Sequence, residues 1–212
     1  MSDNLKALFS AVVEGDLEAV KREVQLALDS NIPPDGILSI GLVAAMKEVG
    51  ARFECGDLYV PEMMVAARAM KAGLAILKPH LSQDATLGMG KVIVGTVKGD
   101  LHDIGKNLVA MMLEGAGCEV IDLGTDVPPE KFAATARETG ARVIGLSALL
   151  TTTMQNMRST LEALEDLGIR RQVLVIVGGA PVTEAFSKDI GADGYAPDAA
   201  LAVKLVQRLT GS

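Results

Sequence analysis

One of the two histidines of the chain stands in a segment whose residue types suit metal ligation. His102 is the third residue of the stretch DLHDIG (residues 100–105), so a carboxylate precedes the imidazole by two residues. The apolar, β-branched run 91–97 before this stretch predicts a core strand, and the spacing of apolar residues in 104–117 predicts a helix with Asp103 as a candidate N-cap. A histidine at a strand end, with a carboxylate to orient its ring, is arranged as an axial metal ligand. A solvated loop histidine beside a capping aspartate would explain the same residues.

The composition excludes several classes of function. Hydrophobic residues make up 49% of the 212 residues, with 3% aromatics and no Trp, which is ample for a compact globular core. The net charge of −7, without a Lys/Arg cluster, argues against nucleic acid as a partner. No apolar run approaches the roughly 18 residues that span a membrane, and the N-terminus lacks a signal-peptide pattern, so we expect a cytoplasmic protein. Cys55 and Cys118 have no metal or redox spacing and are expected to be reduced thiols.

Residues 1–81 have helical periodicity throughout. Asp16 is placed to cap a second helix, and Pro61 to begin a fourth helix that runs to about residue 81. Helices expected near 5–13, 17–28, 37–53 and 61–81, joined by short connections, predict a small all-α four-helix bundle. The polar, glycine-rich stretch 82–90 reads as a linker.

From residue 91 the pattern alternates between strand and helix. We expect strands at 91–97, 119–123, 142–147, 173–177 and 193–195, and helices that begin near Ile104, Pro129, Met154, Val182 and Ala199. This alternation predicts an α/β domain at 91–212 with a five-stranded parallel sheet. The flavodoxin-like strand order 2-1-3-4-5 would bring the carboxyl ends of strands one, three and four to one crevice.

Two more loops would reach that crevice. Ser147, Thr151 and Thr153 follow the third strand and could donate to a polar ligand or to Asp100, although helix capping would need one of these hydroxyls. Gly178-Gly179 follows the fourth strand and would let a flat group approach the backbone, but a tight turn also favours glycine. The loop after the first strand lacks the phosphate-binding glycine spacings.

Together these motifs resemble the cobalamin-binding signature of methionine synthase-like corrinoid proteins. The matching residues are Asp100-x-His102-x-x-Gly105, Ser147-x-Leu149-x-Thr151 and Gly178-Gly179. The helical half resembles the cap domain that precedes this fold, through GLVAAMKEVG (41–50), FECGDLYVPEMM (53–64) and the alanine pair at 66–67. The resemblance covers nearly the whole chain. It is strongest to the free-standing corrinoid proteins of methyltransferase systems.

The resemblance implies a corrinoid bound base-off and His-on, with His102 as the lower cobalt ligand through Nε2. Asp100 would accept a hydrogen bond from the other ring nitrogen, and Thr153 would contact that carboxylate, where Ser is also usual in the family. Further cofactor-binding residues would lie in the three loops and after the fifth strand: Leu101, Asp103, Ile104, Gly105, Ser147, Leu149, Thr151, Gly178, Gly179, Tyr195 and Ala196. In the cap, Tyr59, Met63 and Met64 would shield the upper face of the cofactor, although ordinary helix packing would also explain these three.

The activity that the resemblance implies is methyl carriage, with methylcobalamin as an intermediate, in the demethylation of methanol, methylamines or methoxylated aromatics. The implied partners are a barrel-type substrate methyltransferase, an acceptor methyltransferase and a reductive activase, so the chain would be a subunit rather than a complete enzyme. A cobalamin-dependent sensor or transcriptional regulator is the main alternative. Such proteins usually carry a DNA-binding domain and cap tryptophans. The small subunit of an adenosylcobalamin mutase would lack the helical cap, and an α/β domain without a cofactor is the remaining possibility.

Overall fold

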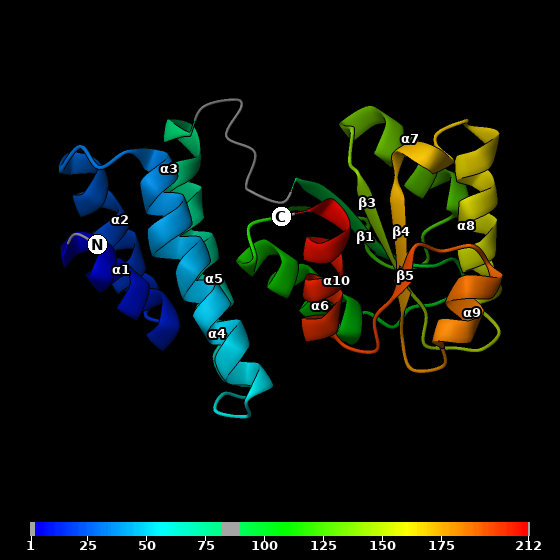
Figure 1. Cartoon of the computed structure of the whole chain (residues 1–212), viewed down its shortest axis with the longest axis horizontal. Coiled ribbons are helices and arrows are strands. Elements are labelled where there is room, and N and C mark those ends of the chain that lie inside the picture. Colours follow the sequence, from blue (N-terminus) through cyan, green and yellow to red (C-terminus); the bar gives the residue numbers. More distant parts are fainter. Residues whose placement is uncertain (1–2, 82–89, 212) are drawn as a thin grey trace. The chain divides into compact units, whose positions relative to one another are not determined.

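The computed structural model describes residues 3–81 and 90–211 of the chain. Except for Gly90, the predicted linker at 82–90 lies outside the described residues. The structure divides into two compact units, a helical one that precedes the sheet and an α/β one that contains all five strands. Each unit is described by itself (Figure 1).

The helical unit contains the four helices that the periodicity predicts. They are α1 (Asp3–Glu14), α2 (Leu17–Asp29), a continuous run of α3 (Pro34–Gly36), η1 (Ile37–Val43) and α4 (Ala44–Glu54), and α5 (Val60–Leu77), which ends in the 3-10 turn η2 (Lys78–His80). Asp16 caps α2, as predicted, through a 2.9 Å hydrogen bond from the Ala19 N–H to its carboxylate. The third helix differs from the expected 37–53, because it begins at Pro34 and η1 is π-helical.

The α/β unit has the predicted sheet. Its strands are β1 (Lys91–Thr96), β2 (Glu119–Asp122), β3 (Val143–Ser147), β4 (Leu174–Gly178) and β5 (Gly194–Tyr195). All pair in parallel in the order β2-β1-β3-β4-β5, so the flavodoxin-like order is confirmed. Helices follow the strands within two residues of the expected starts: α6 (Ile104–Gly115), α7 (Pro129–Thr139), α8 (Gln155–Asp166), α9 (Glu184–Asp189) and α10 (Ala199–Thr210), with a short turn η3 (Arg170–Gln172) before β4.

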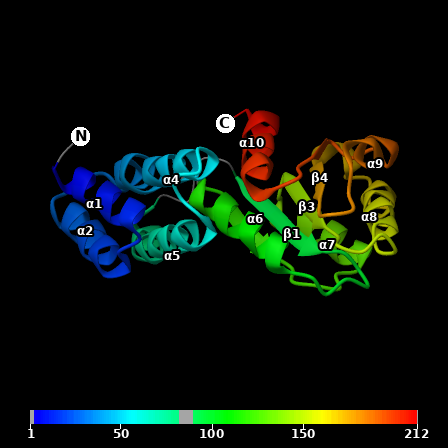
Figure 2. The same cartoon turned by 90° about the horizontal axis from the view of Figure 1, so that it is seen from below.

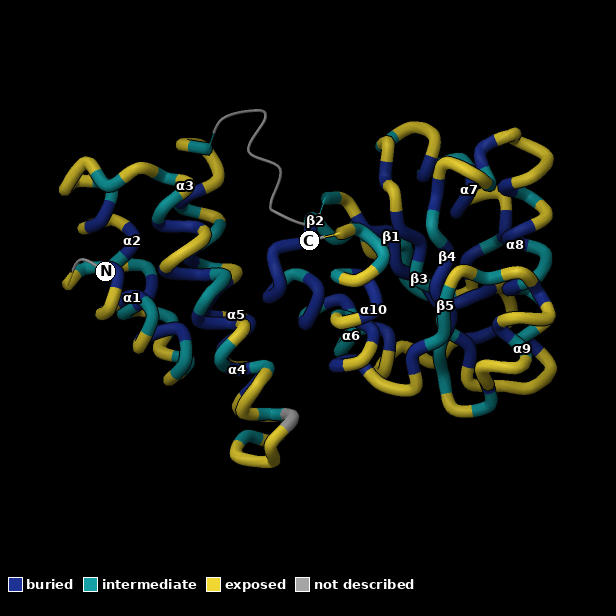
Figure 3. Tube along the Cα trace, viewed as in Figure 1, coloured by how far each residue is buried: buried dark blue, intermediate teal, exposed yellow. Residues whose placement is uncertain are grey.

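The core of the α/β unit lies on both faces of the sheet. Helices α7 and α8 bury Phe132, Met157 and Leu161 against Ile93 and Val175 on one face. Helices α6 and α10 cover the other face (Figures 1 and 2). β1 is buried at every residue after Lys91, and Figure 3 shows this central strand in the buried colour. A nearly continuous apolar strand is what a parallel sheet covered on both faces requires.

Two further sequence expectations concern single features. Within residues 3–81 and 90–211, no helix has both the length and the apolar composition needed to cross a membrane. Both cysteines are free thiols: Cys55 is exposed, whereas Cys118 is buried and burial raises its pKa to about 12.

Candidate cofactor site

The site is built where three strands end side by side. In the register of the sheet, Thr96 of β1 lies opposite Ser147 of β3, which lies opposite Gly178 of β4. The loops after these strands therefore leave the sheet at the same edge, where open α/β sheets bind ligands. The loop after β1 carries Asp100 and His102.

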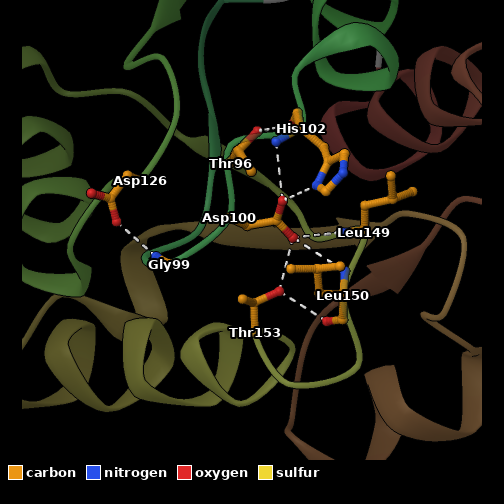
Figure 4. Close-up of polar contacts among 8 residues, drawn as sticks. All are labelled: Thr96, Gly99, Asp100, His102, Asp126, Leu149, Leu150 and Thr153. Carbon is orange, nitrogen blue, oxygen red and sulfur yellow. Dashed lines mark hydrogen bonds and ion pairs between the residues drawn. The ribbon is translucent and has the colours of Figure 1, made fainter.

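The side chains of His102 and Asp100 are in direct contact. His102 Nδ1 lies 2.6 Å from Asp100 Oδ1, and the His102 backbone N–H donates to the same oxygen at 3.1 Å (Figure 4). The Asp100 side chain is fully buried, whereas the His102 side chain is 50% exposed. With its Nδ1 proton directed at the carboxylate, the ring has its lone pair on Nε2, the tautomer that ligates a metal through Nε2.

The other carboxylate oxygen of Asp100 is held by the loop after β3. Oδ2 accepts hydrogen bonds from the N–H groups of Leu149 at 2.7 Å and Leu150 at 3.2 Å. The Thr153 hydroxyl lies 2.8 Å from Oδ2 and 2.8 Å from the Leu150 carbonyl, so its single proton serves one of them at a time. These donors come from residues about fifty positions along the chain from the aspartate, and they fix its carboxylate in one orientation.

These contacts set the charge of the buried carboxyl. Burial by itself raises the pKa of Asp100, but hydrogen bonds from Leu149, His102 and Thr153 outweigh it and hold the pKa well below its usual range. Asp100 is therefore an anion at neutral pH. An anion at this position stabilises the ring proton on Nδ1 of His102.

A cavity of about 570 Å³ opens beside His102, between the sheet edge, α6 and the start of α10. Its walls are mostly apolar, which is typical of a small-molecule or cofactor site. Ten of the predicted binding residues line it: Leu101, His102, Asp103, Ile104, Gly105, Ser147, Leu149, Gly178, Gly179 and Ala196. Asp100, Thr151 and Thr153 are not among its lining residues. Thr151 is exposed, and the other two act behind the histidine.

Gly105 is an exposed residue of the cavity wall that no other part of the chain packs against. A Cβ built on Gly105 would meet no atom within 4 Å outside its chain neighbours and the backbone of its own helix, and the residue lines the cavity in the first turn of α6. Packing within the chain does not require glycine at this position. A side chain would instead project into open space, and that space suits a bound group. The donor set also fits cobalamin, because a neutral imidazole with a carboxylate partner is an ordinary axial ligand of a transition metal.

The surface around His102 is apolar and exposed. Leu101 is 74% exposed, Ile104 86% and Leu149 44%, which is unusual for large aliphatic side chains gathered at one place. A flat, largely apolar ring system would cover them. The residues present at the rim therefore fit a corrin macrocycle held above His102.

The two glycines after β4 have a structural reason of their own. A Cβ on Gly179 would lie 1.9 Å from the Ala148 carbonyl oxygen, and one on Gly178 would lie 2.7 Å from the Ala196 carbonyl oxygen. Gly179 also has φ +125°, where side chains are strained. The tight turn that the sequence left open as an alternative is thus required by packing, although both glycines also line the cavity.

The remaining predicted residues differ in how far they are buried within their own units, and a predicted capping residue acts differently. Tyr195 packs against the core on the α7/α8 face, because neighbours along a strand point to opposite faces and Ala196 takes the cavity side. Met63 is buried, 2% exposed, which is the helix-packing role that its spacing also allowed, whereas Tyr59 and Met64 are exposed at 69% and 37%. The Asp103 carboxylate accepts from the Asn107 side chain at 3.0 Å, in place of the backbone cap expected.

The sequence-based prediction missed several residues of the site. The amide of Leu150 contacts Asp100, but a backbone donor leaves no mark in the residue type. The cavity is also lined by Leu108, Val109, Ala199 and Ala202. The helical spacing of Leu108 and Val109 after Gly105 could have identified that pair, since residues three and four positions along a helix face the same side.

The strand order and the cavity at the carboxyl edge, with a carboxylate-supported histidine on its rim, define the class as a flavodoxin-like cofactor-binding domain preceded by a helical unit. Profiles of two families, each described as a B12 binding domain, match the chain at residues 90–204 and at residues 5–78. The chain belongs to the family of corrinoid proteins that combine these two B12-binding domains.

Relatives match over nearly their whole length. The chain is 43% identical over 209 residues to dimethylamine corrinoid protein 3 of Methanosarcina acetivorans, covering 97% of this chain and 98% of the relative. It is 45% identical over 206 residues to the dimethylamine corrinoid protein of Methanosarcina barkeri, covering 97% and 96%.

A solved structure gives the same fold. A chain in the crystal structure of the methanol:cobalamin methyltransferase complex of Methanosarcina barkeri superposes with a TM-score of 0.91 at 28% identity, covering 100% of this chain and 81% of that chain.

Proposed function

We propose that this protein carries a methyl group on the cobalt of a bound corrinoid between two methyltransferases, with His102 as the lower cobalt ligand. The observation that carries the proposal is the 2.6 Å contact between His102 Nδ1 and Asp100 Oδ1 at the rim of the cavity. Full-length similarity to corrinoid proteins named for dimethylamine supports methylamines as the methyl source.

The residues divide the task of holding the cofactor. His102 ligates through Nε2, and Leu101, Ile104 and Leu149 contact the macrocycle. The cavity takes the nucleotide tail, for which Gly105 leaves room. When bound, cobalamin supplies a cobalt that accepts and releases a methyl group, and the protein supplies ligation, orientation and shielding.

Asp100 controls the proton on the imidazole. Its carboxylate would accept a hydrogen bond from Nδ1–H and so leave Nε2 available to hold the cobalt. The same carboxylate would hold the proton at Nδ1 when Nε2 is not ligated. The Thr153 hydroxyl and the backbone N–H groups of Leu149 and Leu150 hold the carboxylate in place.

Residues 1–81 act in this proposal as a cap domain and residues 91–212 as the cobalamin-binding domain. Tyr59 and Met64 are exposed apolar side chains of the helical unit and are candidates to shield the methyl group. The partners are a barrel-type substrate methyltransferase, an acceptor methyltransferase and a reductive activase. The similar structure from Methanosarcina barkeri is that of a methanol:cobalamin methyltransferase complex, which supports a methyltransferase as a partner.

The test compares the full chain with His102→Ala after loading with hydroxocobalamin. We expect the parent protein to bind the cofactor, and the substitution to change its visible spectrum because the axial nitrogen is lost. The parent protein, once reduced and incubated with a dimethylamine methyltransferase and isotopically labelled dimethylamine, should retain about one labelled methyl group per chain.

Each result decides a separate part of the proposal. An unchanged spectrum in His102→Ala would remove the axial-ligand assignment. A protein that binds cobalamin through His102 and accepts label from neither methylamine nor methanol methyltransferases would not be a methyl carrier. That outcome would favour the cobalamin-dependent sensor.

A further inference from the structure

A residue outside the His102 loop holds this loop at two points. Asp126 follows β2, and its carboxylate accepts a 2.7 Å hydrogen bond from the Gly99 N–H (Figure 4). The backbone N–H of Asp126 donates to the Asp100 carbonyl at 3.0 Å. The two bonds lie on either side of the Asp100 Cα, so Asp126 fixes the backbone from which the His102 partner projects.

Gly99 and Asp126, which the 2.7 Å hydrogen bond joins, both have a left-handed backbone conformation. Asp126 has φ +53° and Gly99 has φ +79°, both in the left-handed region. Among the non-glycine residues that the structure describes, Asn31 is the other one with positive φ. Aspartate tolerates this region better than most residues, but strained backbone persists only where its surroundings hold it. The Asp126 side chain is exposed, so burial does not account for it.

The segment around Asp126 keeps its place without the carboxylate. Val127 forms a parallel bridge with Val97, and the Val127 N–H donates to the Thr96 carbonyl at 3.0 Å. Loss of the Asp126 side chain therefore removes the anchor of Gly99 and leaves the neighbouring chain on the sheet edge.

Gly99 is the residue of the loop that most needs an anchor. Glycine reaches both signs of φ at little cost, so an unheld Gly99 would let Asp100 leave the sheet in more than one direction. Other contacts hold the residues on either side of the Gly99 N–H: the Asp100 N–H donates to the Val97 carbonyl at 3.1 Å, and the Asn156 side chain donates to the Lys98 carbonyl at 2.8 Å. Further along, Thr96 donates to the His102 carbonyl at 2.8 Å, and the loop after β3 holds the Asp100 carboxylate. Asp126 holds the Gly99 N–H, which none of these other contacts reaches.

We propose that Asp126 is a positioning residue for the cobalt ligand: it fixes the Gly99–Asp100 backbone so that His102 presents Nε2 in one orientation. This inference rests on the proposed function, because it assumes that His102 ligates cobalt. It adds a residue that lies 24 positions after the histidine and touches neither the ring nor the cavity lining.

The experiment separates the carboxylate from the backbone conformation with two variants of the full chain. Asp126→Gly keeps the left-handed conformation and removes the acceptor. Asp126→Asn removes the charge and keeps an acceptor oxygen, and it also tolerates positive φ. The proteins are loaded with cob(II)alamin, and electron paramagnetic resonance gives the ratio of molecules with and without an axial nitrogen ligand.

We expect the ratio of His-on to His-off protein to fall about tenfold in Asp126→Gly and to stay within about twofold of the parent in Asp126→Asn. The Gly99 N–H loses its acceptor in the first variant, whereas the amide oxygen of asparagine can still accept the hydrogen bond in the second. Amide hydrogen exchange without cofactor should show the Gly99 N–H exchanging about tenfold faster in Asp126→Gly. This second measurement does not depend on cobalt.

The outcomes distinguish this inference from the proposed function. If the parent protein shows an axial nitrogen that His102→Ala abolishes, but Asp126→Gly matches the parent in ratio and in exchange, the positioning role is wrong and the ligand assignment stands. An equal fall in Asp126→Asn would also overturn the inference, because charge rather than the hydrogen bond would then matter. If the parent shows no axial nitrogen, the proposed function itself fails.

Discussion

Thr153→Val tests how much the buried carboxylate of Asp100 depends on its hydroxyl partner. Valine keeps the shape of threonine and removes the O–H that lies 2.8 Å from Asp100 Oδ2. A hydrogen bond to a charged group contributes about 1.5–3 kcal/mol to stability. Because the amides of Leu149 and Leu150 still contact the same oxygen, we expect a loss of about 2 kcal/mol, toward the lower end of that range. Thr153→Ser keeps the hydroxyl and should lose about 0.8 kcal/mol for one methyl group.

The chain offers a clean spectroscopic probe for this measurement. It contains two tyrosines and no tryptophan, and Tyr195 lies in the α/β unit while Tyr59 lies in the helical unit. In a Tyr59→Phe background, tyrosine fluorescence during urea titration reports unfolding of the α/β unit alone. With a slope of about 2 kcal/mol per M urea, Thr153→Val should lower the unfolding midpoint by about 1 M.

The pH dependence follows from the sign of the Asp100 shift. The folded pKa of this carboxyl lies below its unfolded value, so the stability that it contributes is fully present above the unfolded pKa of about 3.9 and is lost as the pH falls through the folded pKa. The difference between parent and Thr153→Val should be constant at neutral pH and shrink only below about pH 3.9. A Thr153→Val midpoint within about 0.3 M of that of Thr153→Ser would refute the argument.

Three further predictions concern the glycines and the two units. Gly105→Leu should leave the free energy of unfolding unchanged within about 0.5 kcal/mol and weaken cobalamin binding at least about tenfold by titration, and equal affinity would place the ligand elsewhere. Gly179→Ala should lower the free energy of unfolding by more than about 3 kcal/mol or prevent folding, because the new Cβ would meet the Ala148 carbonyl. As a control, Gly168→Ala, at φ +70° but in open space, should lower the free energy of unfolding by about 1–2 kcal/mol in urea. A fragment of residues 88–212 should fold and bind cobalamin, but release its methyl group on illumination faster than the full chain; an equal rate would contradict a shielding role for the helices.

Much of the architecture could be predicted because local patterns and tertiary structure agree. The apolar, β-branched runs are strands because a parallel sheet covered on both faces needs continuous apolar segments. The alternation with helices restricts the order of the strands, and the order brings Ser147 and Gly178 to the edge where His102 stands. The π-helical turn of η1 was not predicted, because π-helix is rare and the apolar periodicity of 37–53 is also that of an α-helix.

The parts of the site that escaped prediction depend on backbone geometry. Leu150 acts through its amide, which every residue but proline possesses. Asp126 acts because its φ is positive and its segment returns to the loop after β1, and neither property is visible in the sequence around it. The packing of Tyr195 against the core was not predicted, because β5 has two residues, too few to show which side chains face the cavity.

The lining of the cavity has a consequence for how such proteins diverge. Every residue of its wall lies between Val94 and Ala202, and the acidic support of the histidine comes from the same stretch. Substitutions in the first 81 residues can therefore accumulate without changing any group that forms this wall. Natural selection can vary one half of the chain while the other keeps its chemistry, and a recombination crossover that falls between residues 81 and 91 would transfer the whole cavity intact to another N-terminal half.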